Sequence, residues 1–581
     1  MNETDLEHYR HSLAHLLAAA VLQKYPDAKP TLGPAIDTGF YYDFEFSEPI
    51  SDDDLKDIQK NMRKKIGSWK SFEGKKVTPE EAQELFKGNP YKLELINEIE
   101  EKNEDITLYT SGNGDFTDLC RGGHTDDLSQ TDPKAFKLDK IAGAYWRGDE
   151  NNTMLTRIYG LAFESKEKLD EYQKNREEAK KRDHRKIGKE LDLFTFSELV
   201  GPGLPLWTPK GTLLRNILDS RVWSLRKKFG YEMVDIPHIT KKDLFVKSGH
   251  WDKFSDELFR INTREGHEFA MKPMNCPFHT QIFARKLFSY REMPQRYANT
   301  TKVYRDEQTG ELHGLSRVRS LTQDDAHVFC RESQFIEEAL NIWEIVETFY
   351  KDSGFGELKV FLSLRDPKKP ELYQGDDKVW IKSEKQLREL IEKKGVEFAE
   401  DIGGAAFYGP KIDFKSYDSL GREWQVATIQ ADRSMPESFD LTCINEKGKK
   451  ERIIMIHAAI MGSIERFLSV LIEHNAGNFP LWMSPVQIKV LPIAEAHHEY
   501  ANEVYNTLTE NGFRVELDNS DEGFGKKVRQ AKLDKVPYFI VIGDEDVKVN
   551  KVTLESRDSG QIGAISVDEV LDKLKEEGEM K

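Results

Sequence analysis

Apolar and polar residues alternate on both sides of a polar turn at Gln308-Thr309-Gly310, and this alternation predicts two strands joined by a loop. The first strand runs into Tyr304-Arg305-Asp306-Glu307, and the second continues from Arg317-Val318-Arg319 toward His327. We therefore expect a hairpin that carries arginines over a cleft. A planar guanidinium group can bind two oxygens of one phosphate, so the hairpin indicates a phosphate-binding site.

The same kind of pattern divides the chain into four parts. Residues 1–163 contain an amphipathic helix at His8–Lys24 and an aromatic strand, which favours a mixed α/β domain. Residues 164–190 are highly charged and favour helix, which predicts a helical linker. Residues 191–483 form a strand-rich body. Residues 484–581 alternate strands with helices, which predicts an α/β domain with a largely parallel sheet.

Two helix–strand units stand out within the strand-rich body. A long amphipathic helix begins near Gly211 and runs into a strand that ends at Pro237. Later, the strand Ile453–Ile456 precedes an apolar helix that is opened by Met461-Gly462-Ser463-Ile464-Glu465-Arg466. A helix–strand unit of either kind is common in proteins. Here one unit precedes the arginine hairpin and the other follows it, and this order carries more information about the fold than either unit alone.

Composition and charge restrict the class of protein. A chain of 581 residues with 38% hydrophobic and 32% charged residues predicts a soluble enzyme of several domains. No apolar run reaches the roughly 18 residues of a membrane span, and the acidic start lacks the pattern of a signal peptide. Four separated cysteines argue against a disulfide framework. We expect a cytoplasmic protein without membrane contact.

The formal net charge of −17 argues against a basic footprint over the whole surface. A local basic face is enough for nucleic-acid binding, however, and Lys174–Lys189 is one candidate. The alternative for this segment is a solvated helix face with pairs of opposite charge four residues apart.

The helix near Gly211, the arginine hairpin and the helix opened by Met461 resemble motifs 1, 2 and 3 of the class II aminoacyl-tRNA synthetases. The residues within and around the motifs resemble those of threonyl-tRNA synthetases, in a form without the N-terminal ubiquitin-like domain. The resemblance implies a multidomain α+β and α/β fold with an antiparallel catalytic sheet. It assigns residues 1–163 to an α+β editing domain, 164–190 to the linker, 191–483 to the catalytic domain and 484–581 to an α/β anticodon-binding domain. Motif 1 implies a homodimer.

The resemblance also implies the reaction and its nucleotide site. L-Threonine would attack ATP, bound with Mg²⁺, to form an adenylate, and the amino acid would then pass to tRNA(Thr). Arg305 would hold the α-phosphate and the attacking carboxylate, and Glu307 would hold the adenine amino group. Arg317 would bind the terminal phosphates, and Arg466 would lie over the adenine ring. The residues implied in catalysis are Arg305, Arg466, Gln323 and Asp325, and Gln430 joins the nucleotide-binding set.

A metal site follows from a different group of residues. Spacing alone suggests that Cys276 and His279, a Cys-x-x-His pair, bind zinc together. The resemblance instead implies one Zn²⁺ per subunit held by Cys276, His327 and His457. Three protein ligands leave an open face at which threonine can bind through its amino group and hydroxyl. Valine lacks the hydroxyl and would be rejected. The implied amino-acid pocket consists of Met274, Gln323, Asp325, Tyr408, Lys411 and Gln430.

Serine also carries a hydroxyl, and one missing methylene is worth only about 1–3 kcal/mol, so a second sieve is expected. His11 and His15 are four residues apart and share a helix face, and Cys120 and His124 have the same spacing. Core packing is the plainer interpretation of each pair alone. Together they resemble the editing site shared by threonyl and alanyl enzymes, which adds Asp118 and Lys92. The four residues of the two pairs would either bind zinc or position a water molecule.

Three other functions are consistent with parts of the sequence. A seryl or prolyl enzyme would share the motifs but lack the set Cys276, His327 and His457. A non-catalytic RNA-binding regulator would not need both Arg305 and Arg466. A zinc hydrolase built on the N-terminal cluster would leave the hairpin without a role. In the last domain, basic residues at Gly525–Arg529 would face anticodon phosphates.

Overall fold

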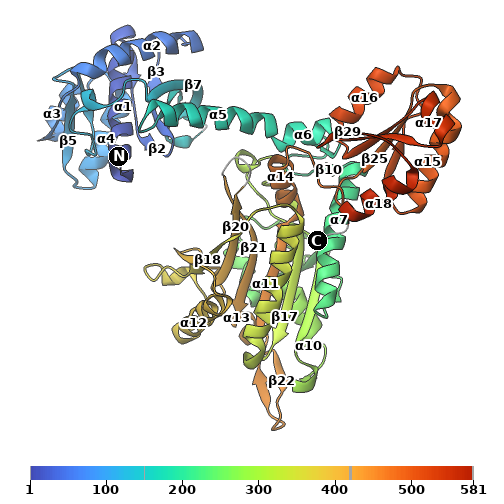
Figure 1. The fold of residues 1–581 in the computed structure, drawn as a ribbon. Coiled ribbons are helices and arrows are strands. Elements are labelled where there is room, and N and C mark those ends of the chain that lie inside the picture. The colour runs from blue at the N-terminus through green and yellow to red at the C-terminus, as the bar shows by residue number, and fades with distance from the viewer. Residues whose placement is uncertain (1, 150, 418–421, 579–581) are drawn as a thin grey trace. The chain divides into compact units, whose positions relative to one another are not determined.

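The computed structural model describes residues 2–149, 151–417 and 422–578. The chain divides into two compact units, Met1–Glu178 and Ala179–Lys581 (Figure 1). None of the helices within the described ranges is long and apolar enough to cross a membrane.

The first unit is built around helix α1 (Glu3–Lys24) and an antiparallel sheet. Asn2 caps α1 because its side-chain oxygen accepts a hydrogen bond from the backbone N–H of Asp5, and the Asp5 carboxylate accepts one from the backbone N–H of Asn2. The helix packs on β3 and buries leucine and alanine side chains, which explains its position in the core of the unit. The sheet contains β1 (Lys29–Pro30), β2 (Ala35–Ile36), β3 (Gly39–Glu45), β7 (Phe136–Tyr145) and β8 (Met154–Ala162).

A second, smaller sheet of this unit leads directly into the predicted Cys-x-x-x-His pair, Cys120 and His124. It pairs β5 with both β4 and β6, and the chain leaves β6 one residue before Cys120. Its strands are β4 (Phe72–Val77), β5 (Ile106–Ser111) and β6 (Phe116–Leu119). The other helices of the unit are α2 (Asp52–Lys65), α3 (Pro79–Leu85) and α4 (Pro90–Glu101).

The linker is helical, as the composition predicts, and it consists of two helices rather than one. Helix α5 (Lys166–Arg182) ends where Asp183 adopts a non-helical conformation and caps α6 (His184–Glu190) through the backbone of Arg185. Some basic side chains of α5 and α6 pair with acidic groups, as Arg185 does with Asp183 at 2.5 Å. Arg176 makes two hydrogen bonds to Asp139, at 2.7 and 2.8 Å.

An eight-stranded sheet forms the centre of the second unit, in the order β11-β16-β17-β24-β21-β20-β18-β19. The pairs are antiparallel except at the two edges, β11–β16 and β18–β19, which are parallel. The apolar helix α11 (Phe335–Asp352) packs against β24, β21 and β17. The strands are β11 (Glu232–Met233), β16 (Gln295–Tyr304), β17 (Ser320–Cys330), β18 (Lys359–Leu364), β19 (Phe398–Ile402), β20 (Lys411–Tyr417), β21 (Glu423–Asp432) and β24 (Ile454–Ser463).

The arginines of the hairpin lie beside the strands and not on them, which corrects the sequence prediction. The β16–β17 pairing ends at Tyr304 and Ser320, and one further backbone bond joins Arg305 to Arg319. The Arg319 N–H then bonds to the carbonyl of Gly203. Because this donor is taken by another segment, the ladder stops, and Arg305 and Arg317 lie in the connecting loop.

The helix after β24 also begins later than the apolar pattern suggests. β24 continues through Met461 to Ser463, and Gly462 has a φ of +71°, which favours glycine. Ser463 then caps α14 (Ile464–His474) by accepting a hydrogen bond from the backbone N–H of Arg466. The turn therefore places Arg466 in the first turn of the helix.

Other elements complete the body of this unit. Helix α7 (Pro209–Lys228) is the long helix expected before the first strand of the sheet. The remaining helices are α8 (Lys242–Ser248), α9 (His250–Lys253), α10 (Cys276–Ala284), α12 (Asp377–Lys394) and α13 (Ser434–Ser438). The small sheets contain β9 (Phe194–Thr195) and β10 (Leu206–Trp207); β12 (Ile239–Lys241), β13 (Arg260–Asn262) and β14 (Glu268–Met271); and β15 (Phe288–Ser289), β22 (Thr442–Ile444) and β23 (Lys450–Arg452).

The last part of the chain is an α/β domain whose sheet is mixed. β25 pairs in parallel with β26 and β27, as the pattern predicts, and β28 and β29 then add two antiparallel strands at one edge. The strands are β25 (Ile488–Pro492), β26 (Val515–Leu517), β27 (Tyr538–Ile542), β28 (Val552–Ser556) and β29 (Gly560–Ile565). The helices are α15 (His498–Glu510), α16 (Phe524–Leu533), α17 (Asp544–Val549) and α18 (Val567–Gly578).

Candidate functional site

Three side chains from separate elements converge in the central sheet. Cys276 begins α10, His327 lies on β17 and His457 lies on β24, and all three are buried. Their possible ligand atoms lie within 4.8 Å of one another. The register of the sheet sets this arrangement, because His327 and His457 are directly paired across β17 and β24. Cross-strand partners project from the same face of a sheet.

In each of His327 and His457, one ring nitrogen lies within hydrogen-bond distance of a side chain outside the set of three. His457 Nε2 lies 2.8 Å from a carboxylate oxygen of Asp432, and His327 Nδ1 lies 2.7 Å from Nδ1 of His279. An ionised carboxylate only accepts hydrogen bonds, so His457 carries its proton on Nε2 and turns the lone pair of Nδ1 inward. That lone pair lies 3.1 Å from His327 Nε2.

The charge state of the cluster suits a soft metal ion. Burial lowers the pKa of His327 well below its ordinary value and raises that of the Cys276 thiol. Neutral imidazoles and a thiol that can release its proton to an ion form a set of two nitrogens and one sulfur, which zinc prefers. A carboxylate behind one ligand and an imidazole behind the other are the outer contacts that orient such ligands.

The spacing-based pairing of Cys276 with His279 is not what the geometry shows. His279 is buried behind His327, and its Nε2 is a buried nitrogen without a hydrogen-bond partner among the described residues. Two contacts of the cluster have no signal in the sequence. His250 Nε2 lies 3.6 Å from the Cys276 sulfur, and Asp432 holds His457. Their elements are remote in the chain, so spacing does not place them.

The residues expected to bind the amino acid surround this cluster. Asp325 is buried, accepts a hydrogen bond from Asn275 at 3.1 Å and has its pKa raised to about 6, chiefly by burial. The Tyr408 ring stacks on His457 with centroids 4.8 Å apart, and its hydroxyl donates to Gln430. The buried carbonyl oxygen of the Gln323 side chain has no partner among the described residues.

The other two expected pocket residues have structural contacts of their own. Lys411 lies opposite Gln430 on the paired strands β20 and β21, and its ammonium group is 2.6 Å from Asp413. Met274 packs against the apolar cluster that contains Cys276. Of the expected pocket residues, Asp325, Tyr408 and Gln430 therefore lie directly beside the two convergent histidines.

Beside this pocket lies a group of cations. Burial lowers the pKa of Arg466, and the positive charges of Arg305 and Arg317 lower it further. Arg305 Nε is buried without a hydrogen-bond partner among the described residues. Glu307 balances one of these charges and lies 2.7 Å from Arg317. A cluster with excess positive charge and an unpartnered N–H is suited to a polyphosphate.

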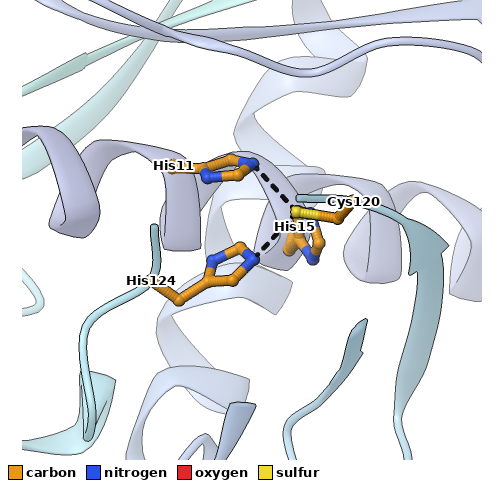
Figure 2. A group of neighbouring side chains, drawn as sticks. All are labelled: His11, His15, Cys120 and His124. Carbon is orange, nitrogen blue, oxygen red and sulfur yellow. Dashed lines mark hydrogen bonds between the residues drawn. The ribbon is translucent and has the colours of Figure 1, made fainter. Parts of the chain in front are cut away.

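A second cluster lies in the first unit. His11 and His15 on α1 meet Cys120 and His124 from the segment after β6 (Figure 2). The Cys120 sulfur lies 3.6 Å from His11 Nε2 and 3.3 Å from His124 Nε2. Burial raises the pKa of Cys120 to about 11 and, with the neighbouring histidines, lowers that of His124 to about 2.

Hydrogen bonds around the cluster determine the tautomers of two of its rings. His11 Nδ1 lies 3.1 Å from the carbonyl of Gly123, so it donates. His124 Nδ1 lies 3.3 Å from the hydroxyl of Ser12, which gives its own hydrogen to the carbonyl of His8. Both rings therefore turn an Nε2 lone pair toward Cys120, and the cluster offers two acceptors to a water molecule or an ion.

A buried ion pair completes the second cluster. Lys92 lies 2.5 Å from Asp118, and both side chains are almost fully buried. The hydroxyl of Tyr42 donates to Asp118 as well. These charges act on the histidines, since Asp118 favours and Lys92 opposes protonation of the rings they face. The structure thus brings all six residues expected at the editing site into one region.

Comparison with known proteins identifies the family. The model described as the tRNA synthetase class II core domain matches residues 259–475, and the anticodon binding domain matches residues 487–577. The threonyl and alanyl tRNA synthetase second additional domain matches residues 106–159. The threonine–tRNA ligase of Borreliella afzelii is 45% identical over 562 residues, which cover 97% of this chain and 96% of that protein. The chain belongs to the threonyl-tRNA synthetases.

Other relatives agree with this assignment. The threonine–tRNA ligase of Acetivibrio thermocellus is 46% identical over 570 residues, 98% of this chain and 88% of that protein. A crystal structure of the RNA binding domain of threonyl-tRNA synthetase from Cryptosporidium parvum covers 68% of this chain and 98% of its own, with 36% identity and a TM-score of 0.65. Giardia lamblia prolyl-tRNA synthetase, at 18% identity and a TM-score of 0.54, shares the fold.

Membership confirms the predicted fold class and enzyme class. The threonyl-tRNA synthetase has a class II core, an anticodon-binding domain and an editing-type domain, and its substrates are threonine, ATP with Mg²⁺ and tRNA. One detail of the anticodon-binding domain differs from expectation. Lys527 is buried and donates to the carbonyl of Asp518 at 2.9 Å, so it is unavailable to a phosphate.

The lowered histidine pKa values predict that the first unit loses stability in mild acid. His11, His15 and His124 have pKa values below the 6.5 of the unfolded chain, so the unfolded state gains protons first as pH falls. Stability is therefore greatest above about pH 7.5 and declines as the pH falls through 6.5; His124, whose pKa is about 2, contributes a loss of about 1.3 kcal/mol between about pH 7.5 and 5.5, and His11 and His15 add to it.

Hydrogen exchange of the α1 backbone amides, corrected for the intrinsic pH dependence, measures this loss after dialysis against a chelator. A His124→Gln variant is expected to show a smaller pH dependence than the wild-type protein, because one of the three groups that take up protons on unfolding is removed. Protection that does not change with pH would contradict the assignment of neutral histidines.

Proposed function

We propose that this chain selects L-threonine at a zinc ion held by Cys276, His327 and His457 and joins it to tRNA(Thr) through an adenylate. When bound, zinc provides an open coordination face that takes the amino group and hydroxyl of threonine and discriminates against valine. The inward Nδ1 lone pair of His457, the facing Nε2 of His327 and the buried Cys276 sulfur, with Asp432 and His279 behind the two imidazoles, are the observations that carry the proposal.

Residues around the ion orient the amino acid. The carboxylate of Asp325 lies 3.7 Å from His327 Nε2 and is placed to accept a hydrogen bond from an N–H of the threonine amino group. The unpartnered oxygen of Gln323 is a second acceptor on the same strand. Tyr408 and Gln430 close the pocket from the other side of His457. Because Asp325 and Tyr408 are buried, water competes little with these two side chains for the substrate.

The arginine cluster performs the first chemical step by position and charge. The threonine carboxylate forms a bond to the α-phosphorus of ATP, and the bond to the β-phosphate oxygen breaks, which releases pyrophosphate. Arg305 balances charge on the α-phosphate, and Arg466 and Arg317 neutralise the outer phosphates together with Mg²⁺. Glu307, now paired with Arg317, is placed to accept from the adenine amino group once Arg317 turns to phosphate. The tRNA ribose hydroxyl then attacks the adenylate carbonyl and releases AMP.

The N-terminal cluster is proposed to hydrolyse seryl-tRNA. The inward lone pairs of His11 and His124 accept hydrogen bonds from one water molecule, whose oxygen attacks the ester carbonyl. Neutral histidine can take the proton that this water loses, and the leaving ribose oxygen regains a proton. The Lys92–Asp118 pair stabilises the charge near the reacting groups. This proposal assigns no metal to the editing site.

The chain is also proposed to form a homodimer through α7 and β11. Met233 on β11 is 65% exposed, and a cavity of about 530 Å³ beside it is lined by residues of α7, including Trp223. An exposed apolar side chain next to an open cavity is typical of a surface that a second copy covers. A measurement of the molecular mass in solution is expected to give twice the mass of one chain.

A Cys276→Ser variant tests the zinc proposal. Loss of the sulfur ligand is expected to remove bound zinc and to lower threonine-dependent ATP–pyrophosphate exchange more than about 100-fold, because the substrate loses its anchoring ion. Metal analysis and exchange kinetics measure the two effects. Cys443→Ser is the matched control, since Cys443 is equally buried in the same apolar cluster and lies outside the convergent set. Full exchange by a zinc-free Cys276→Ser protein would contradict the proposal.

A His11→Ala/His15→Ala variant tests the editing proposal. Threonyl-tRNA formation is expected to stay within about twofold, because the catalytic residues lie in the other unit. Seryl-tRNA is expected to accumulate at least about tenfold, since the water loses its general base. Charging assays with serine and threonine provide the measurement. His8→Ala, one turn earlier on α1 and outside the four-residue set, is the control. An unchanged seryl-tRNA level would reject the assignment.

A further inference from the structure

His184, at the start of α6, connects the linker to one loop of the arginine cluster and to the end of α14. The side chain is fully buried, and its Nδ1 lies 2.6 Å from a carboxylate oxygen of Glu473 near the end of α14. The backbone N–H of His184 donates to the same oxygen at 3.1 Å. On the other side of the ring, the backbone N–H of Leu315 donates to Nε2 at 3.0 Å.

These contacts determine the tautomer of the ring. The Leu315 amide can only donate, so Nε2 must present a lone pair, and the ring proton therefore lies on Nδ1 and is given to Glu473. Both nitrogens are thus used within the protein. This pairing also accounts for the closeness of Asp183, His184 and Glu473 without an ion among them.

The loop that His184 holds is the one that carries the nucleotide-binding arginines. The carbonyl of Ser316, next after Leu315, accepts a hydrogen bond from Arg466 Nε at 3.2 Å, and the Ser316 hydroxyl lies 2.9 Å from that of Ser469. Arg317 follows directly. By holding the Leu315 amide, the His184 ring also positions the next two residues of the loop. These are Ser316, whose carbonyl bonds to Arg466, and Arg317.

Close packing leaves the loop little freedom to approach the ring in another way. Gly314 has a φ of +50°, and a Cβ atom at this position would lie 2.2 Å from His184 Nε2. Glycine is therefore required where the loop backbone passes the imidazole. Leu315 itself is completely buried. The contact is a specific hydrogen bond in a tight fit.

We propose that His184 is a positioning residue for ATP: it holds Leu315–Arg317 so that Arg317 and Arg466 meet the phosphates in a fixed geometry. This inference rests on the proposed function of the arginine cluster. Glu473 has a second partner, Arg422, so the end of α14 stays anchored when His184 changes. The Leu315 amide has no second acceptor among the contacts described for it.

Two conservative substitutions separate the two hydrogen bonds of the ring. In His184→Asn the amide nitrogen takes the place of Nδ1, which keeps the bond to Glu473 and loses the acceptor for Leu315. In His184→Gln the amide oxygen reaches the place of Nε2, which keeps the acceptor and loses the bond to Glu473. Both variants are neutral and smaller than or similar in size to histidine, which makes each the control of the other.

The measurement is ATP–pyrophosphate exchange with threonine, as KM values for ATP and for threonine. The KM for ATP of the Asn variant is expected to rise about tenfold, because the loss of one hydrogen bond to a buried amide typically has an effect of this size. The Gln variant is expected to stay within about threefold of the wild type, and the KM for threonine is expected to be unchanged in both. An unchanged KM for ATP in the Asn variant, or equal impairment of both variants, overturns the inference.

Hydrogen exchange of the wild-type protein provides a check that needs no variant. The Leu315 amide is expected to exchange slowly, and rapid exchange would overturn the inference. The proposed function fails separately, if the wild-type protein shows no threonine-dependent exchange of pyrophosphate. If the wild-type protein catalyses pyrophosphate exchange and the His184→Asn variant has an unchanged KM for ATP, only the role of His184 is rejected.

Discussion

The pairing of β17 with β24 is the constraint on which the proposed chemistry depends. This register sets His327 opposite His457, and the pairing of β21 with β24 sets Gln430 opposite the same histidine. Alternate residues of a strand face opposite sides of a sheet, so a shift of one residue would turn the ligands away from Cys276. The apolar helix α11 covers this sheet and supports its register.

Burial gives the two clusters and the arginine site their chemical character. Burial lowers the pKa values of His327 in the first cluster and of His11, His15 and His124 in the second, so these rings are neutral at neutral pH. In the arginine cluster, Arg305 and Arg317 lie close enough to Arg466 to lower its pKa, and the buried Nε of Arg305 has no hydrogen-bond partner among the described residues. A phosphate that pairs with these groups would relieve the repulsion between their charges.

Local patterns predicted a large part of the fold. The alternation around residue 308 located β16 and β17, and the charged stretch after residue 164 located the helical linker. The predicted strand positions of Arg305 and Arg317 were wrong because Gly203, distant in sequence, takes the hydrogen bond that would extend the ladder. The helix after β24 starts at Ile464 because Gly462 allows a turn that the apolar pattern does not reveal.

For the candidate sites too, some residues were predictable from the sequence and others were not. Cys276, His327 and His457 were expected through resemblance, and the sheet brings them together. The contacts that orient them, from Asp432 and His279, were not predictable from spacing, because each comes from another element through tertiary packing. His184 illustrates the same limit, since its partners Leu315 and Glu473 are far away along the chain.

X-ray absorption spectroscopy at the zinc edge of the purified protein tests the central claim most directly. The account predicts one sulfur ligand at about 2.3 Å and two imidazole nitrogens at about 2.0–2.1 Å, with the remaining position filled by a lighter atom that changes when threonine is added. A spectrum without a sulfur ligand, or a zinc-free protein that still activates threonine, would contradict it.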